Sequence, residues 1–244
     1  MTRKKLTLVG AGPGDPDLIS LKGVKVLKDA DVVLYDALVH SDILAYIPDT
    51  VELVFVGKQK GVCQFKQEDI LSLIVEYASK DKHVVRLKGG DSFIFGRGHE
   101  EMDYAKKFNI PVDVVPGISS FYSVPELNGI PLTRRGVSES FFVVTGTTRD
   151  HKLSHDIEQA AKTPSTLVIL MGMHKLPEIV AVFQGLGKGS IPVAIIQNGS
   201  RENEKVGFGE MDTIVDVVAK EGLGSPAIIV VGDVVKIHDQ FQSS

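Results

Sequence analysis

Two glycine-rich loops hold the residues whose types and spacing could do chemistry. The first reads LVGAGPGDPDLISL, with glycines at Gly10, Gly12 and Gly14, of which Gly10 and Gly12 match the first two glycines of a dinucleotide-binding G-x-G-x-x-G loop. Asp15 replaces the third glycine of that pattern, and the two prolines of the loop lack the amide donors that bind a pyrophosphate. The loop therefore disfavours a polyphosphate, although Asp36 stands where a ribose-binding acid would follow.

The second loop, in VVRLKGGDSFIFGRGHEE, places Gly89, Gly90 and Asp91 after a buried apolar run. Adjacent glycines let a flat group lie against bare backbone, and a carboxylate accepts hydrogen bonds from hydroxyls or an amine. Glycines and acids together favour a ligand that carries an adenosine and a positive charge. S-adenosyl-L-methionine has both, so the sequence favours it as the ligand, and a nicotinamide dinucleotide is the alternative.

The composition predicts a cytoplasmic protein and disfavours nucleic acids and acidic membranes as its general partners. The chain has 244 residues and a formal net charge of -4, whereas nucleic acids and acidic membranes select basic surfaces. Its one cysteine, Cys63, cannot form an intrachain disulfide, which fits a reducing compartment. The basic first residues precede too short an apolar stretch for a signal peptide, and no apolar run approaches the roughly 18 to 20 residues of a membrane span.

Short β-branched runs alternate with longer amphipathic segments along the chain. Uniformly apolar runs are typical of parallel strands covered on both faces, so we expect an α/β fold with mostly parallel sheets. Ligands bind such sheets beyond the carboxyl ends of the strands. Pro116 and Gly117 interrupt the pattern, which predicts domains over residues 1–117 and 118–244 with a cleft between them. Ser20 is expected to cap the first helix.

Eight motifs, in order along essentially the whole chain, resemble those of the tetrapyrrole methylase family. They are VGAGPGDPDLISLKG, DADVVLYDALV, VFVGK, VVRLKGGDSFIFGRGHEE, VVPGISS, GIPLTRR, LVILMG and SPAIIVVG. Each motif alone is weak evidence for the family, whereas the eight motifs in this order are strong evidence for it. The resemblance implies two α/β domains of the tetrapyrrole methylase fold, S-adenosyl-L-methionine in the cleft between them, and a homodimer.

The resemblance also implies a set of donor-binding residues. Carried over motif by motif, these are Pro13, Gly89, Gly90, Asp91, Ile94, Ser119, Ser120, Met171, Gly199 and Ala227. The chain departs from the family pattern in two places. Ser92 follows the GGD motif where the family usually has proline, and two serines follow PGI where it usually has threonine and alanine.

The reaction implied is the transfer of two methyl groups to C2 and C7 of uroporphyrinogen III, which gives precorrin-2 for cobalamin or sirohaem biosynthesis. The YDALV and VGK motifs favour this reaction over those of later precorrin methylases. By the same resemblance, Asp36 is the expected base and Lys58 its acid partner. The substrate carries eight carboxylates, for which the candidate partners are Lys58, Lys60, Arg97, Arg134 and Arg135.

Simpler interpretations stay open for several of these residues. Asp36 could be a turn residue, since aspartate is common in turns, and Met171 could fill a core. His151 and His155 have the spacing of helix metal ligands, but no third ligand joins them, so we expect no metal. The rival functions are a nicotinamide-dependent oxidoreductase and a non-catalytic tetrapyrrole or nucleotide carrier.

Overall fold

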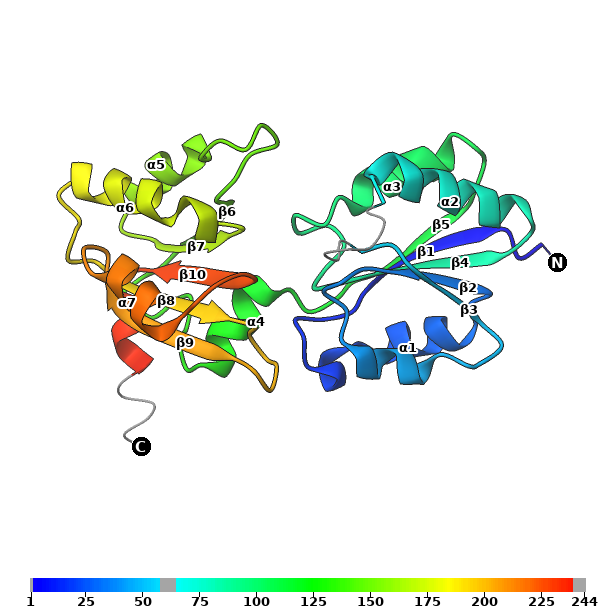
Figure 1. Ribbon diagram of the computed structural model, residues 1–244, viewed down its shortest axis with the longest axis horizontal. Coiled ribbons are helices and arrows are strands. Elements are labelled where there is room, and N and C mark those ends of the chain that lie inside the picture. The colour runs from blue at the N-terminus through cyan, green and yellow to red at the C-terminus, as the bar shows by residue number, and fades with distance from the viewer. Residues whose placement is uncertain (1, 58–64, 239–244) are drawn as a thin grey trace. The chain divides into compact units, whose positions relative to one another are not determined.

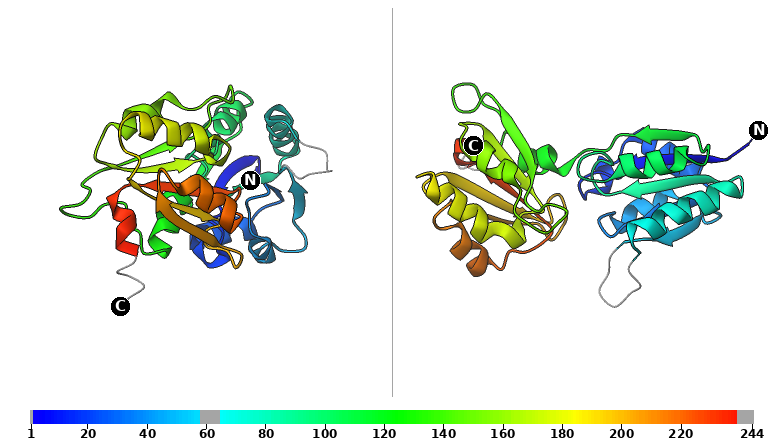
Figure 2. Two further views of the ribbon diagram at one scale, coloured as in Figure 1. Left: turned by 60° about the vertical axis from the view of Figure 1, so that its left-hand side comes forward. Right: turned by 90° about the horizontal axis from the view of Figure 1, so that it is seen from above.

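The computed structural model describes residues 2–57 and 65–238. The chain divides into two compact units, Met1–Ser119 and Ser120–Ser244, where the sequence predicts a boundary between residues 117 and 118. Each unit contains one five-stranded sheet with helices on its faces (Figures 1 and 2). The alternation of strands and helices that the sequence predicts is present in both units.

The first unit has a fully parallel sheet with strand order β3-β2-β4-β1-β5. Its strands are β1 (Lys5–Gly10), β2 (Val32–Tyr35), β3 (Glu52–Phe55), β4 (His83–Lys88) and β5 (Val112–Val115). Its helices are α1 (Leu21–Lys28), α2 (Gln67–Ser79) and α3 (Gly98–Lys106), with short 3-10 turns at Pro16–Leu18 and Ser41–Tyr46. The parallel sheet expected from the apolar runs is confirmed here.

Successive strand residues of this sheet pack into two separate cores. Val9, Val33 and Val85 face α1, whereas Leu8, Leu34 and Val84 face α2 and α3. Figure 1 shows α1 on one side of the sheet and the other two helices on the opposite side. Strands β1 and β4 are neighbours, and the chain leaves them in opposite directions across the sheet, from β1 to β2 and from β4 to β5, so α1 and α3 lie on opposite faces. A gap between diverging loops at such a switch point is the usual ligand site of a parallel α/β sheet.

The first helix begins where the sequence predicts. The Ser20 hydroxyl accepts a hydrogen bond from the backbone N–H of Gly23 at 3.0 Å, which satisfies one of the free amides of the first turn of α1. This late start leaves residues 11–19 as a loop rather than the direct strand-to-helix turn of a dinucleotide site.

The second unit has a mixed sheet with strand order β6-β7-β10-β8-β9. Its strands are β6 (Phe141–Thr145), β7 (Thr166–Leu170), β8 (Pro192–Gln197), β9 (Lys205–Glu210) and β10 (Ala227–Val231). Only β6 and β7 pair in parallel, so the expectation of a mostly parallel sheet is wrong for this unit. The short β8–β9 connection forms a hairpin, which reverses the chain direction. Strand β10 keeps that reversed direction and pairs antiparallel with both its neighbours.

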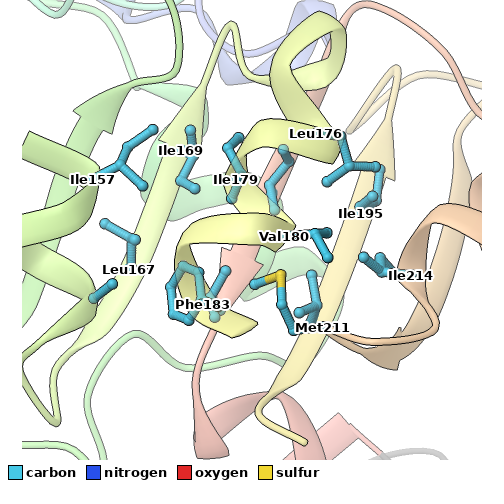
Figure 3. Close-up of a cluster of buried hydrophobic side chains, with 14 of the residues drawn as sticks. Ile157, Leu167, Ile169, Leu176, Ile179, Val180, Phe183, Ile195, Met211 and Ile214 are labelled. Atoms are coloured by element: carbon cyan, nitrogen blue, oxygen red, sulfur yellow. The ribbon is translucent and has the colours of Figure 1, made fainter. Parts of the chain in front are cut away.

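Helices cover both faces of the second sheet. They are α4 (Ser120–Leu127) on one face, with the 3-10 turn Asp233–Ile237, and α5 (His155–Ala161), α6 (Leu176–Gly185) and α7 (Ile214–Glu221) on the other. Phe183 of α6 belongs to the larger core together with Leu167 and Ile169 of β7 (Figure 3). Burying each such side chain contributes about 1.5 to 3 kcal/mol to stability, which keeps the strand ends of this unit in place.

Stability should fall in mild acid because of His83, at the start of β4. Its side chain is 4% exposed, and Nε2 lies 2.8 Å from the Thr7 hydroxyl, while Nδ1 lies 3.1 Å from the Asp29 carbonyl oxygen. Burial lowers the pKa of His83 below its ordinary value. The unfolded chain then binds a proton that the folded chain refuses, so the contribution is complete above about pH 6.5 and is lost as the pH falls below it.

Thermal melts between about pH 7.5 and about pH 5.5 test this expectation. We expect the melting temperature of the wild type to fall over this range, and His83→Gln to remove part of the fall. His155→Gln, at an exposed histidine of α5, is the matched control and should melt as the wild type does. An identical pH dependence in all three proteins would contradict the assignment.

Candidate active site

The predicted residues of the first unit gather at one edge of its sheet. Because all five strands are parallel, their carboxyl ends meet at the same edge. Pro13 follows β1, Asp36 follows β2, and Gly89–Asp91 follow β4. The loops after β1 and β4 flank the switch point between these neighbouring strands. The tertiary fold therefore brings the two glycine-rich loops of the sequence together.

Backbone contacts lock the two loops against each other. Gly12 and Gly90 form an antiparallel bridge, with N–H to O distances of 3.2 Å from Gly12 and 2.7 Å from Gly90. Gly10 packs on Gly117, which follows β5, so closely that a Cβ on Gly10 would lie 2.5 Å from the Gly117 Cα. Gly10 and Gly117 must be glycines because their backbones approach each other so closely, whether or not a ligand is bound.

Gly90 differs from these structural glycines. Its φ is +65°, and among the described residues a Cβ built on it would meet no atom within 4 Å beyond its chain neighbours. The residue therefore presents bare backbone to open space at the switch point. A flat ligand group could lie directly against this exposed backbone.

The Asp91 carboxylate holds the loop in shape. Its Oδ1 accepts a hydrogen bond from the backbone N–H of Phe93 at 2.8 Å, and its Oδ2 accepts one from the N–H of Gly117 at 2.9 Å. Each oxygen keeps a further lone pair that can accept a hydrogen bond from a ligand. That contact with the ligand stays a prediction. Ile94, in the same loop, is 39% exposed.

Asp36 lies directly after β2 and combines a turn with an ion pair. Its Oδ1 accepts a hydrogen bond from the N–H of Leu38 at 3.1 Å, and its Oδ2 lies 3.5 Å from Arg86 Nη2. The Asp36 side chain is 23% exposed, whereas that of Arg86 is 4% exposed. Asp36 is thus a turn residue, as its simpler interpretation predicts, and it also presents a carboxylate at the carboxyl edge of the sheet.

A buried polar cluster beneath Asp36 was missed by sequence reasoning. Glu101 of α3 is fully buried, and its Oε1 accepts hydrogen bonds from Arg86 Nε at 3.2 Å and Lys88 Nζ at 2.9 Å. The Gln67 amide of α2 donates to the same oxygen at 3.2 Å. Burial and the neighbouring Arg86 lower the pKa of Lys88, and Glu101 opposes them. One feature of the sequence could have indicated this cluster. Arg86 and Lys88 lie two residues apart in an apolar strand, and Glu101 follows in the next helix.

Ser92, where the family pattern has proline, should contribute little to stability through its hydroxyl. The residue is 1% exposed, and among the described residues its Oγ has no hydrogen-bond partner. An unpaired buried hydroxyl costs about 1 to 3 kcal/mol, so Ser92→Ala should leave the free energy of unfolding unchanged or raise it. Urea unfolding measures the effect.

Ser20→Ala is the matched control for that measurement. It removes a serine hydroxyl that has a partner, so it should lower the free energy of unfolding by about 1 kcal/mol. If Ser92→Ala were as destabilising as Ser20→Ala, the Ser92 hydroxyl would have a partner, and the explanation would be wrong.

Three predicted residues of the second unit also share one edge of a sheet. Met171 follows β7, Gly199 lies after β8, and Ala227 begins β10. Strand β10 is antiparallel to β7 and β8, and Ile228 pairs with Leu170 while Ala227 pairs with Gln197. The start of β10 therefore lies beside the ends of the other two strands.

Met171 is exposed in an unusual backbone conformation, whereas Gly199 packs against a helix. Met171 has a φ of +56° and is 53% exposed, so it does not fill a core. An exposed side chain in this strained conformation is a candidate for a functional role. Gly199 packs against α4, where a Cβ would overlap the Val124 side chain, so its glycine has a structural reason. Ser119 is buried, and Ser120 begins α4.

Several predicted residues are not part of these two groups. Lys58, Lys60 and Cys63 lie outside the described residues. The guanidinium of Arg97 pairs with Glu100 at 2.7 Å, and Arg134 and Arg135 lie in an exposed turn of the second unit. The expected cleft between the domains stays a prediction.

No metal or membrane segment is found in the described part of the chain. Over residues 2–57 and 65–238, no group of three or more His, Cys, Asp and Glu side chains could hold a metal ion. His151 lies in a loop before α5, so its spacing from His155 is not that of one helix face. The same residues include no helix with the length and apolar character of a membrane span.

The whole chain is similar to known methyltransferases. The sequence profile of the tetrapyrrole (corrin/porphyrin) methylases matches residues 5–215. The uroporphyrinogen-III C-methyltransferase of Methanocaldococcus jannaschii is 48% identical over 96% of this chain and 98% of its own length. The siroheme synthase of Actinobacillus succinogenes is 42% identical over 97% of this chain, which spans 49% of that longer protein. The crystal structure of Thermus thermophilus uroporphyrin-III C-methyl transferase complexed with S-adenyl homocysteine superposes with a TM-score of 0.82 at 37% identity, covering 96% of this chain and 99% of that one.

Proposed function

Because the chain belongs to the tetrapyrrole (corrin/porphyrin) methylase family, we propose that it methylates uroporphyrinogen III at C2 and C7 and gives precorrin-2. The observation that carries this proposal is its near full-length identity with a uroporphyrinogen-III C-methyltransferase. This function takes the place of the nicotinamide alternative, since the first loop places prolines and acids where a pyrophosphate needs amide donors. The product would enter cobalamin or sirohaem biosynthesis.

The loops at the switch point fit S-adenosyl-L-methionine as the methyl donor. Gly90 offers open space over bare backbone, which a Cβ would begin to fill. Bound there, the donor supplies an electrophilic methyl group on a positively charged sulfur. We propose that the residues that bind it are Pro13, Gly89, Gly90, Asp91, Ile94, Ser119, Ser120, Met171, Gly199 and Ala227. Holding the reacting atoms in line is worth about 7 to 11 kcal/mol, so binding and orientation are the main work of these residues.

The Asp36 carboxylate is the proposed base. When a pyrrole carbon gains a methyl group, the ring must release a proton, and a carboxylate at the carboxyl edge of the sheet can accept it. The Arg86 guanidinium lies beside this carboxylate, with Nη2 3.5 Å from Oδ2, and forms an ion pair with it. Lys58 is the proposed acid partner, as the family resemblance implies.

We further propose that the protein acts in the cytoplasm as a homodimer. A single cysteine and the absence of a long apolar run in the sequence support the compartment. Strand β6 is at the edge of the second sheet and exposes Phe141 and Phe142, both 43% exposed. Exposed apolar edge strands invite pairing with another chain, which supports self-association. Sedimentation equilibrium measures the mass of the assembly.

A methyl-transfer assay with labelled donor tests the proposed function. Uroporphyrinogen III should accept two labelled methyl groups, added one at a time. A later precorrin methylase would label only an already methylated ring, and a carrier would bind the tetrapyrrole without labelling it. Binding of NAD in place of S-adenosylhomocysteine would favour the oxidoreductase instead.

A further inference from the structure

The Arg86 side chain links Glu101 to the carboxyl end of β2. Its Nη1 donates hydrogen bonds to the carbonyl oxygens of Leu34 at 3.2 Å and Leu87 at 3.0 Å, while Nε contacts Glu101 and Nη2 faces Asp36. Leu34 precedes Asp36 by two residues. Arg86 therefore contacts both the backbone that leads to Asp36 and the Asp36 carboxylate itself.

Packed apolar side chains are the usual way to fill a place like this one, so the buried charges need a separate explanation. The surrounding core on the α2/α3 face consists of aliphatic side chains such as Leu8, Leu34 and Ile74. Replacing a buried ion network with packed apolar residues is often neutral or stabilising, because removing charges from water costs several kcal/mol per ion. The buried polar cluster of Arg86, Lys88 and Glu101 contacts Asp36, whose side chain is 23% exposed. We therefore look for its role in what it does to Asp36.

The charges of Arg86, Lys88, Glu101 and Asp36 cancel only when all four are counted together. Arg86 and Lys88 carry two positive charges, and Glu101 and Asp36 carry two negative charges. Glu101 meets both cations through one oxygen, and among the described residues its Oε2 has no hydrogen-bond partner. Without the Glu101 charge, Asp36 would be the one carboxylate left to balance Arg86 and Lys88 among the ion pairs of the described residues. Its carboxylate would then be drawn toward the cluster and away from a reacting ring.

We infer that Glu101 is a positioning residue, which orients Arg86 and neutralises Lys88 so that the Asp36 carboxylate stays at the edge of the sheet and free to accept a proton. The inference rests on the proposed function of Asp36 as the base. Glu101 touches no reacting atom in this account. It acts through Arg86.

A double-mutant cycle tests the inference on the full chain. Glu101→Gln should lower the single-turnover methyl-transfer rate by about tenfold or more, the scale of a misplaced catalytic group. The affinity for S-adenosylhomocysteine should stay within about twofold of the wild type, since Glu101 is fully buried. In an Asp36→Asn background, the same change should have no further effect on the rate.

Glu52→Gln is the matched control. This carboxylate at the start of β3 also accepts two donors, the Tyr77 hydroxyl and Lys82 Nζ, but it lies at the amino edge of the same sheet. It should leave the methyl-transfer rate unchanged. Arg86→Lys repeats the cycle if Glu101→Gln does not fold, because lysine keeps the charge but cannot make all the contacts of the guanidinium.

The possible results separate this inference from the proposed function. A folded, donor-binding Glu101→Gln variant with the wild-type rate would overturn the positioning role alone. Equal slowing in the presence and absence of Asp36 would also overturn it, since Glu101 would then act by another route. A wild-type rate in Asp36→Asn by itself would overturn the proposed base, and the inference with it.

Discussion

Replacement of Asp36 with asparagine should lower the single-turnover methyl-transfer rate by at least about a hundredfold, the scale of a lost general base. Asparagine keeps the side-chain oxygen that accepts the Leu38 N–H, so the turn after β2 survives. It cannot remove a proton at neutral pH, and it offers no charge to Arg86. The affinity for the methyl donor should remain near that of the wild type.

A thermal melt and a donor titration beside the rate measurement separate the roles of Asp36. Asp69→Asn is the matched control, because Asp69 also accepts a backbone N–H, that of Lys66, but in the first turn of α2. If Asp36 served only the turn, its replacement would lower the melting temperature and scarcely change the rate. A rate within a factor of a few of the wild type, on a folded and donor-binding variant, would remove Asp36 from the mechanism.

Replacement of Gly90 with valine should abolish the binding of S-adenosylhomocysteine that calorimetry measures. Over the residues that the structure describes, a Cβ at this position meets no atom within 4 Å beyond its own chain neighbours, so the space that the new side chain occupies is the space proposed for the ligand. The φ of +65° adds backbone strain of roughly 1 to 2 kcal/mol for a residue other than glycine. Strain alone would affect stability and leave the affinity of the folded protein near normal.

Gly187→Val supplies the control for strain. Gly187 has a φ of +68° and also meets nothing within 4 Å, but it lies in the loop after α6, away from the glycine-rich loops in the sequence. Both variants should lose similar stability, and only Gly90→Val should lose ligand binding. Unchanged affinity in a folded Gly90→Val protein would show that this loop does not hold the donor.

Much of the first unit could be predicted from the sequence because local signals agree with the fold there. Uniformly apolar runs indicate strands covered on both faces, and the order of strand and helix then requires parallel pairing. Ser20 caps α1 as expected. Asp36 and the GGD loop follow strand ends in the sequence, and parallel strands place all such ends at one edge. Residue order alone therefore sufficed to predict that these groups meet.

The second sheet shows where residue order is insufficient. Strand β9, read as KVGFGE, contains two glycines and lacks a uniformly apolar run, so it was not expected from the sequence. Gly207 packs closely there, since a Cβ would lie 2.6 Å from the end of the Leu223 side chain. The unexpected strand forms the hairpin with β8 that reverses β10, and that reversal brings Ala227 beside the end of β7.

The sequence by itself determined the family, the parallel first sheet and the loops that carry the candidate donor site. Only the tertiary structure decided which charges lie beneath them. Arg86 and Lys88 resemble ordinary surface cations in the sequence, and they are buried because β4 is central and α3 brings Glu101 over it. Burial of a charge depends on partners supplied by distant segments, since an isolated ion cannot leave water without a large cost. That pairing exists only in the folded chain.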